Sequence, residues 1–200
     1  MNTQLLDQAK NVRQGEELDT QKVDAWLKQH ITQLTGEPSV TQYAGGASNW
    51  TYCLEYPEQS LILRRAPKGT KAKGAHDMGR EFKLQQALKP VYGYVPNMEA
   101  FCDDENILGT DFYVMEKLTG IIPRKNLPRG LTPTPERTKK LCENVLDCLV
   151  ELHKVDYKQA NLSHLGKGEG YTQRQISGWS ERVTKAKTRN IPSGKKIITW

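Results

Sequence analysis

The protein is a chain of 200 residues, 36% hydrophobic, 26% charged and 8% aromatic, with a formal net charge of +6. This composition is typical of globular proteins and excludes collagen-like, low-complexity and intrinsically disordered chains. The apolar runs are only a few residues long, far short of the roughly 20 apolar residues of a membrane-spanning helix, so we expect no membrane association.

The opening residues and the cysteines both favour a cytoplasmic location. The first eight residues have no basic start, no apolar stretch and no small-residue cleavage site of the kind that secretory signals carry. No two cysteines have the Cys-x-x-Cys spacing of zinc or redox sites, so we interpret them as small buried thiols in a reducing compartment. They are Cys53, Cys102, Cys142 and Cys148.

The positive charge is concentrated at the end of the chain. Residues 165–200 hold eight basic side chains against two acidic ones. Such a stretch could attract an anionic or phosphate-bearing ligand, or it could form the solvated face of a helix. Few aromatic residues alternate with the basic ones, so we do not expect nucleic-acid binding.

Residues 20–35 are the first predicted helix, with an N-cap at Asp19 or Thr20 and an end before Gly36 and Pro38. Its apolar residues recur at helical spacing and predict one buried face. They are Val23, Leu27, Ile31 and Leu34.

Short segments rich in β-branched and aromatic residues follow and predict an antiparallel sheet. The predicted strands are residues 40–43, 51–56, 61–64 and 112–115. One helix, roughly residues 76–89, interrupts them and is closed by Pro90.

Beyond Gly120 the pattern is helical. Thr134, Pro135 and Glu136 supply a capping hydroxyl, a proline at the first position and an acid in the first turn, and the predicted helix runs to about His153. Its apolar stripe is Leu141, Val145, Leu149 and Leu152. A last helix is expected from Thr172, with Gln175 completing a capping box. The predicted buried side of that helix is Ile176, Trp179 and Val183. The predicted fold class is α+β in two lobes.

Three features of the sheet region fit together chemically. The turn at residues 44–49 contains two glycines, which suit either a phosphate cradle or an ordinary hairpin. Arg64 shares one strand face with Ile62, where a cation is costly unless an anion meets it. Glu81 lies at helical spacing with Leu84 and Leu88 and can supply that anion. We therefore expect Arg64 and Glu81 to be partners, although either residue alone could be solvated.

The order of glycine turn, strand cation, helix glutamate and a final strand resembles a protein-kinase-like N-lobe. In its local sequence motifs, the chain most resembles the aminoglycoside phosphotransferase family, in the branch found fused to acyl-CoA dehydrogenases. The resemblance runs from about residue 38 to the end of the chain. The segments that carry it are residues 40–49, 63–67, 80–82, 109–116 and 152–156.

The resemblance implies ATP-dependent phosphorylation of a hydroxyl group on a small molecule. It implies a protein-kinase-like fold with a small antiparallel-sheet N-lobe that carries one helix, and an incomplete helical C-lobe. The corresponding division is an N-terminal helical leader (1–37), a nucleotide-binding N-lobe (38–118) and a partial helical C-lobe (119–200).

The resemblance also assigns residues to the phosphates of ATP. Arg64 would replace the usual lysine, binding the α- and β-phosphates while paired with Glu81; a guanidinium keeps this role because it is always charged. The residues that would cover the triphosphate are Gly45, Gly46, Ser48 and Asn49.

Four more residues are assigned to adenine. Met115 would lie behind the base, and Ile62 would pack on its ring. The carbonyl of Glu116 and the amide of Leu118 would form hydrogen bonds with the edge of the adenine ring.

The chemistry of the family resides in a His-Gly-Asp-x-x-x-x-Asn loop and a later aspartate, neither of which occurs in this sequence. We therefore assign no catalytic or metal-binding residue and expect Mg²⁺ only in a complete enzyme. We expect the chain to be an N-terminal piece of a longer phosphotransferase, inactive alone and with exposed apolar surface. The acceptor is expected to be a small molecule, anionic or linked to coenzyme A. The alternatives are a pseudokinase-like nucleotide-binding module and, third, an RNA-associated basic protein.

Overall fold

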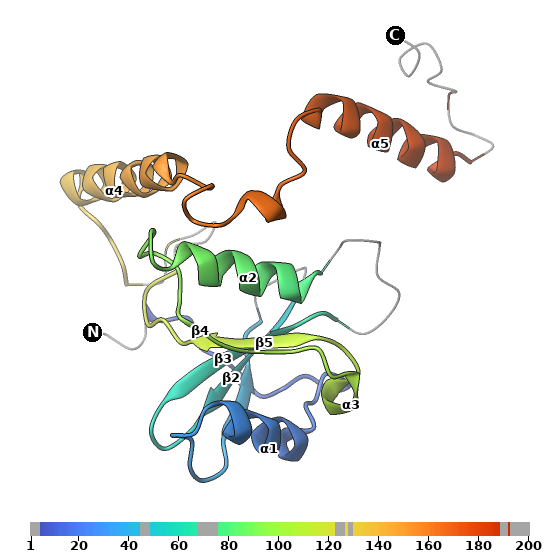
Figure 1. Ribbon diagram of the computed structural model, residues 1–200. Helices are drawn as coiled ribbons and strands as arrows, with labels where there is room; N and C mark the ends of the chain where they lie inside the picture. Colours follow the sequence, from blue (N-terminus) through green and yellow to red (C-terminus); the bar gives the residue numbers. More distant parts are fainter. Residues whose placement is uncertain are drawn as a thin grey trace.

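The computed structural model describes residues 5–44, 49–67, 76–122, 127, 130–188 and 192. At its centre is a five-stranded antiparallel sheet with the strand order β1-β2-β3-β5-β4 (Figure 1). The strands are β1 (Ser39–Gln42), β2 (Trp50–Glu55), β3 (Ser60–Arg65), β4 (Met98–Cys102) and β5 (Phe112–Glu116). Four of them match predicted strands, and β4 is an addition that the sequence did not predict. This strand lies at the edge of the sheet and carries the exposed Glu99, so its apolar pattern is weak.

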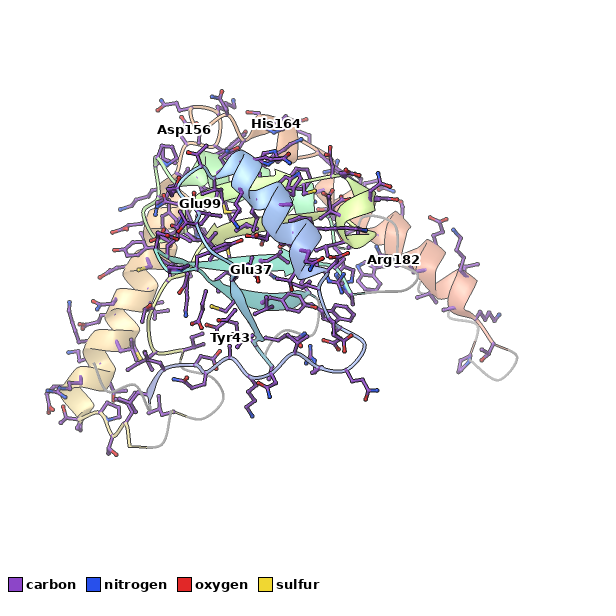
Figure 2. All side chains as sticks on the ribbon, turned by 90° about the horizontal axis from the view of Figure 1, so that it is seen from below. Glu37, Tyr43, Glu99, Asp156, His164 and Arg182 are labelled. Atoms are coloured by element: carbon purple, nitrogen blue, oxygen red, sulfur yellow. The ribbon has the colours of Figure 1, made fainter. Side chains whose placement is uncertain are left out.

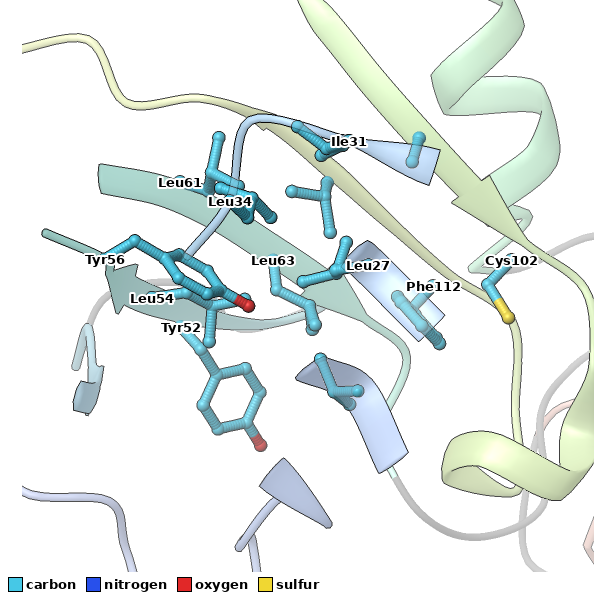
Figure 3. Close-up of a cluster of buried hydrophobic side chains, with 13 residues drawn as sticks. Leu27, Ile31, Leu34, Tyr52, Leu54, Tyr56, Leu61, Leu63, Cys102 and Phe112 are labelled. Atoms are coloured by element: carbon cyan, nitrogen blue, oxygen red, sulfur yellow. The ribbon is translucent and has the colours of Figure 1, made fainter. Parts of the chain in front are cut away.

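Helices cover both faces of the sheet, α2 (Met78–Leu88) on one and α1 (Thr20–His30) with the short α3 (Glu105–Leu108) on the other (Figure 1). The main hydrophobic core lies between α1 and the sheet (Figure 3). Leu27 of α1, Leu63 of β3 and Phe112 of β5 are fully buried there. The predicted α+β fold class is therefore confirmed.

Helix α1 begins after Asp19, one of its two predicted caps, whose carboxylate accepts a hydrogen bond from the amide of Lys22. It ends at His30, earlier than the predicted residue 35, because the chain leaves the helix at Ile31. Ile31 and Leu34 remain buried because the turn folds them back onto the same core.

The residues before α1 also pack on the sheet. Lys10 pairs with Gln42 through two backbone hydrogen bonds of 2.8 and 2.7 Å, and the hydroxyl of Tyr52 donates to the carbonyl of Glu16 at 2.6 Å. The leader thus shares interactions with the sheet, while the predicted boundary at residue 37 stays a prediction.

The second half of the chain forms α4 (Pro135–Lys154), the short helix η2 (Ser163–Leu165) and α5 (Tyr171–Ala186). Ala160 and Leu162 pack against Leu88 of α2 and attach this region to the sheet lobe. Helix α4 begins as predicted, with the hydroxyl of Thr134 accepting from the amide of Arg137.

Two predictions for α5 are wrong. The helix begins at Tyr171, after Gly170 in the left-handed conformation, so Thr172 lies inside the helix and forms no capping box. Its expected buried side is exposed, because α5 extends away from the sheet lobe (Figure 1). The exposed fractions are 56% for Ile176, 59% for Trp179 and 52% for Val183.

The cysteines follow the same division. Cys53 and Cys102, on strands, are buried thiols as predicted, whereas Cys142 on α4 is exposed and Cys148 is half-buried. Within the described residues, no helix combines the length and the apolar character that crossing a bilayer requires.

Candidate functional site

Arg64 of β3 and Glu81 of α2 form the predicted ion pair. The guanidinium Nη1 lies 3.3 Å from the carboxylate Oε2, and the two side chains are 30% and 35% exposed. Strand alternation turns Arg64 toward α2, and Asp77 fixes the start of that helix by accepting from the amide of Arg80 at 2.8 Å. Leu84 is exposed, so the inward face of α2 is narrower than predicted.

Tyr113 of β5 joins this pair, and the sequence analysis did not single it out. Its hydroxyl accepts a hydrogen bond from Arg64 Nη1 at 2.9 Å and donates to Glu81 Oε2 at 3.0 Å. Gln85 donates to the same hydroxyl at 3.4 Å. Burial raises the pKa of Tyr113 to about 12. The neighbouring Glu81 carboxylate also raises this pKa, whereas the Arg64 guanidinium lowers it. The phenol is therefore protonated at neutral pH and remains a donor.

Asn49 completes the surroundings of Glu81. Its side-chain nitrogen donates to Glu81 Oε1 at 3.0 Å, and its oxygen faces His76 Nδ1 at 2.8 Å. The Asn49 side chain is buried and points toward α2. The predicted contact of this side chain with a triphosphate stays a prediction, and its observed partners are Glu81 and His76. The other predicted turn residues, Gly45, Gly46 and Ser48, lie outside the described residues.

A cavity of about 750 Å³ meets this network at Gln85, whereas Arg64, Glu81 and Tyr113 are not among the residues that line it. It is lined by residues of β1, β2, β3, α2 and β5, and by the segment that follows β5. Of the predicted adenine residues, Ile62 and Met115 lie directly opposite each other on β3 and β5, on the sheet face that carries Arg64. All four predicted adenine residues line the cavity: Ile62, Met115, Glu116 and Leu118.

Other residues of the cavity were not predicted. The N-terminal residues 6–9 form part of its wall, as does Gln85, which links the cavity to Tyr113. No local signal marks these residues, because they reach the cavity only through the folding of distant segments.

Lys117 and Glu55 close one side of the cavity with an ion pair of 3.3 Å between Nζ and Oε1. Burial acts to lower the pKa of Lys117, but the neighbouring Cys53 thiol, Tyr43 and Glu55 outweigh it and leave this pKa above its usual value. A positive charge is thus held at the edge of the cavity.

The cavity suits a nucleotide in size and chemistry. Its volume falls within the roughly 300–1,000 Å³ typical of small-molecule sites, and apolar Ile62 and Met115 flank polar groups. The cation of Arg64 stands on the same sheet face. No group of three or more His, Cys, Asp or Glu side chains arranged for a metal ion occurs in the described part of the chain.

Comparisons with known proteins point in one direction. Residues 39–195 match the family described as "Phosphotransferase enzyme family". Acyl-CoA dehydrogenase family member 11 from Homo sapiens is 34% identical over 186 residues, which cover 91% of this chain and 24% of that protein. Acyl-CoA dehydrogenase family member 10 from Mus musculus is 34% identical over 169 residues, 84% of this chain and 16% of that protein. The chain therefore spans a quarter or less of these relatives.

The chain is also similar to solved structures. The crystal structure of a putative aminoglycoside phosphotransferase from Ralstonia eutropha JMP134 superposes with a TM-score of 0.70 and 31% sequence identity. The match covers 92% of this chain and 53% of that one.

Proposed function

The chain belongs to the phosphotransferase enzyme family, and we propose that its sheet lobe binds ATP for phosphorylation of a hydroxyl group on a small molecule. The observation that carries the proposal is the Arg64–Glu81 ion pair, which stands beside a cavity of nucleotide size. A cation held by a carboxylate at this position can bind phosphate oxygens while the cavity receives the base.

In the proposed base site, the apolar side chains of Ile62 and Met115 make van der Waals contact with the adenine ring. Asn97 holds Glu116 in place by accepting from its amide at 2.9 Å and donating to its carboxylate at 3.0 Å. This support fixes the backbone where the carbonyl of Glu116 and the amide of Leu118 would meet the edge of adenine.

The proposed phosphate site combines Arg64 with the turn that contains Gly45, Gly46 and Ser48. Asn49 anchors the end of this turn to Glu81. When bound, ATP would supply the transferable phosphoryl group, and Mg²⁺ would accompany its phosphates. We assign no described residue of this chain to the metal.

The proposed acceptor is a small anionic or coenzyme-A-linked molecule. The basic stretch at residues 174–196 motivates this choice, and α5 displays part of it away from the sheet (Figure 2). Arg182 stacks on Trp179, with Cζ 4.8 Å from the ring centroid, and Lys185 pairs with Glu181 at 2.5 Å. If these charges attract the acceptor, acceptor affinity in the full-length protein should fall as salt rises.

The test is ATP affinity, measured by calorimetry on the wild-type chain and on Arg64→Ala. We expect the substitution to weaken ATP binding by at least about tenfold, because a charged hydrogen bond to phosphate is lost. Arg137→Ala, at an exposed position on α4, is the matched control and should bind as the wild type does. Equal ATP affinity of the Arg64→Ala and wild-type chains contradicts the proposal.

The second candidate is a pseudokinase-like module that binds nucleotide without catalysis. The sequence motivates it, since the 200 residues contain no His-Gly-Asp motif. Because the 200 residues are expected to be inactive alone, ADP release is measured on the full-length protein: ATP binding with ADP release supports the enzyme, and ATP binding without ADP release supports the module.

A further inference from the structure

We propose that Tyr113 is the positioning residue for Arg64, holding its guanidinium in the orientation that binds phosphate. This inference rests on the proposed function, because it concerns the same phosphate site. In this inference, the orientation of the Arg64 guanidinium depends on Tyr113 of β5 as well as on the ion pair with Glu81.

The pairing of the strands places the two side chains together. Arg64 on β3 lies directly opposite Tyr113 on β5, so both side chains stand on the same sheet face. The guanidinium carbon lies 5.8 Å from the centre of the phenol ring, and Nη1 donates to the hydroxyl at 2.9 Å. The ring and its hydroxyl therefore both contact the cation.

The hydroxyl also links the cation to its counter-ion. Glu81 Oε2 accepts a hydrogen bond from the Tyr113 hydroxyl at 3.0 Å and lies 3.3 Å from Arg64 Nη1. One nitrogen of the guanidinium thus meets both partners. Among contacts with other described residues, none involves Nη2 or Nε of Arg64, which leaves two nitrogen atoms of the planar guanidinium, with three N–H donors, for phosphate.

Tyr113 is itself held rigidly. Its side chain is fully buried, its ring contacts Phe82 with centroids 6.3 Å apart, and Gln85 donates to its hydroxyl. A long arginine side chain loses conformational freedom when it binds a ligand, so a fixed partner that orients it beforehand favours phosphate binding.

The central variant is Tyr113→Phe, tested with ATP and with adenosine, which has no phosphate. We expect ATP binding to weaken by about tenfold, because the hydrogen bonds of the hydroxyl to the charged Arg64 and Glu81 are lost. We expect adenosine binding to stay within about twofold, because Ile62 and Met115 are unchanged. An equal loss for both ligands would mean that Tyr113 only supports the fold, and it would overturn the inference.

Tyr52→Phe is the matched control. Tyr52 is also fully buried in the sheet, and its hydroxyl is also hydrogen-bonded, but it donates to the carbonyl of Glu16 in the N-terminal leader and has no contact with Arg64 or Glu81. Binding of both ligands to this variant should match the wild type. A loss of ATP binding as large as that of Tyr113→Phe would overturn the inference.

A second pair of variants tests whether Tyr113 acts through the guanidinium. In an Arg64→Lys background, Tyr113→Phe should change ATP affinity by less than about threefold. The reason is that a lysine ammonium has no planar guanidinium for the Tyr113 hydroxyl to orient. A full tenfold loss in that background contradicts the inference.

The outcomes separate the inference from the proposed function. If the wild-type chain binds no ATP, both are wrong. If it binds ATP, and Arg64→Ala weakens binding while Tyr113→Phe leaves it unchanged, the proposed function stands and the inference is wrong.

Discussion

The sheet lobe and the outer helices α4 and α5 differ in what covers their apolar side chains. In the lobe, Leu27, Leu63 and Phe112 are fully buried between α1 and the strands. On α4, Val145 and Leu146 are 59% and 60% exposed. Both regions have amphipathic patterns, so the pattern predicts which face of a helix is apolar, but a neighbouring element decides whether that face is buried.

Charged groups differ between the two regions in the same way. Arg64 lies in a network with Glu81 and Tyr113. On α5, Lys185 and Glu181 pair in open solvent, where such a pair contributes little. Four predictions, from the largest expected effect to the smallest, test whether stability resides mainly in the sheet lobe.

The largest effect is expected from the core. Phe112→Ala should lower the free energy of unfolding by about 3–5 kcal/mol, since it leaves a cavity under α1. Leu146→Ala on α4 removes a side chain that is largely exposed to solvent, and it should change the free energy of unfolding by less than about 0.5 kcal/mol. Urea denaturation of both variants measures the contrast, and losses of equal size would break the comparison.

The second effect concerns alkaline stability. The pKa of Tyr113 is raised from 10.0 to about 12 in the folded state. The folded protein therefore keeps a proton that the unfolded chain releases, so this contribution is complete below pH 10 and is lost as the pH rises through about 12.

At about pH 11 the wild type should have lost about 1.4 kcal/mol of unfolding free energy that Tyr113→Phe does not lose. Denaturation midpoints at neutral and alkaline pH measure this difference. Tyr171→Phe, at an exposed ring on α5, should behave as the wild type does. A parallel alkaline decline in the wild type and Tyr113→Phe contradicts the prediction.

The third effect compares two helix caps. Asp77→Ala should lower the free energy of global unfolding by about 1 kcal/mol, because α2 packs on the sheet. Thr134→Ala removes the corresponding cap of α4 and should fray only that helix.

Hydrogen exchange measures the difference between the caps. Thr134→Ala should speed exchange in the first turn of α4 and leave the strand amides unchanged. Unchanged exchange of the strand amides after Asp77→Ala, or faster exchange of the strand amides after Thr134→Ala, would count against the division into two regions.

The smallest effect compares two ion pairs with the same spacing. Lys28 pairs with Asp24 at 2.7 Å and also donates to the carbonyl of Gly36 at 2.6 Å, so Lys28→Ala should cost about 0.5 kcal/mol. Lys185→Ala on α5 should leave thermal stability unchanged within error. A larger loss for Lys185→Ala would show that α5 has partners that the sheet lobe does not provide.

Local patterns were sufficient to predict much of the candidate site. Alternation along β3 and helical spacing in α2 turned Arg64 and Glu81 inward, and the structure joins them. Tyr113 could not be predicted in the same way, because it is 49 residues from Arg64 and reaches it only when β3 and β5 pair. The side chain of Asn49 likewise points to Glu81 because α2 lies over the sheet.

By itself, the sequence determined the α+β class, the cap at Thr134 and the ion pair of Arg64 with Glu81, and it narrowed the first cap to Asp19 or Thr20, because each depends on the spacing of nearby residues. Only the tertiary structure decided the edge position of β4, the contribution of the N-terminal residues 6–9 to the cavity and the exposure of α5. These features depend on which distant segments pack together, and that packing is a property of the whole fold.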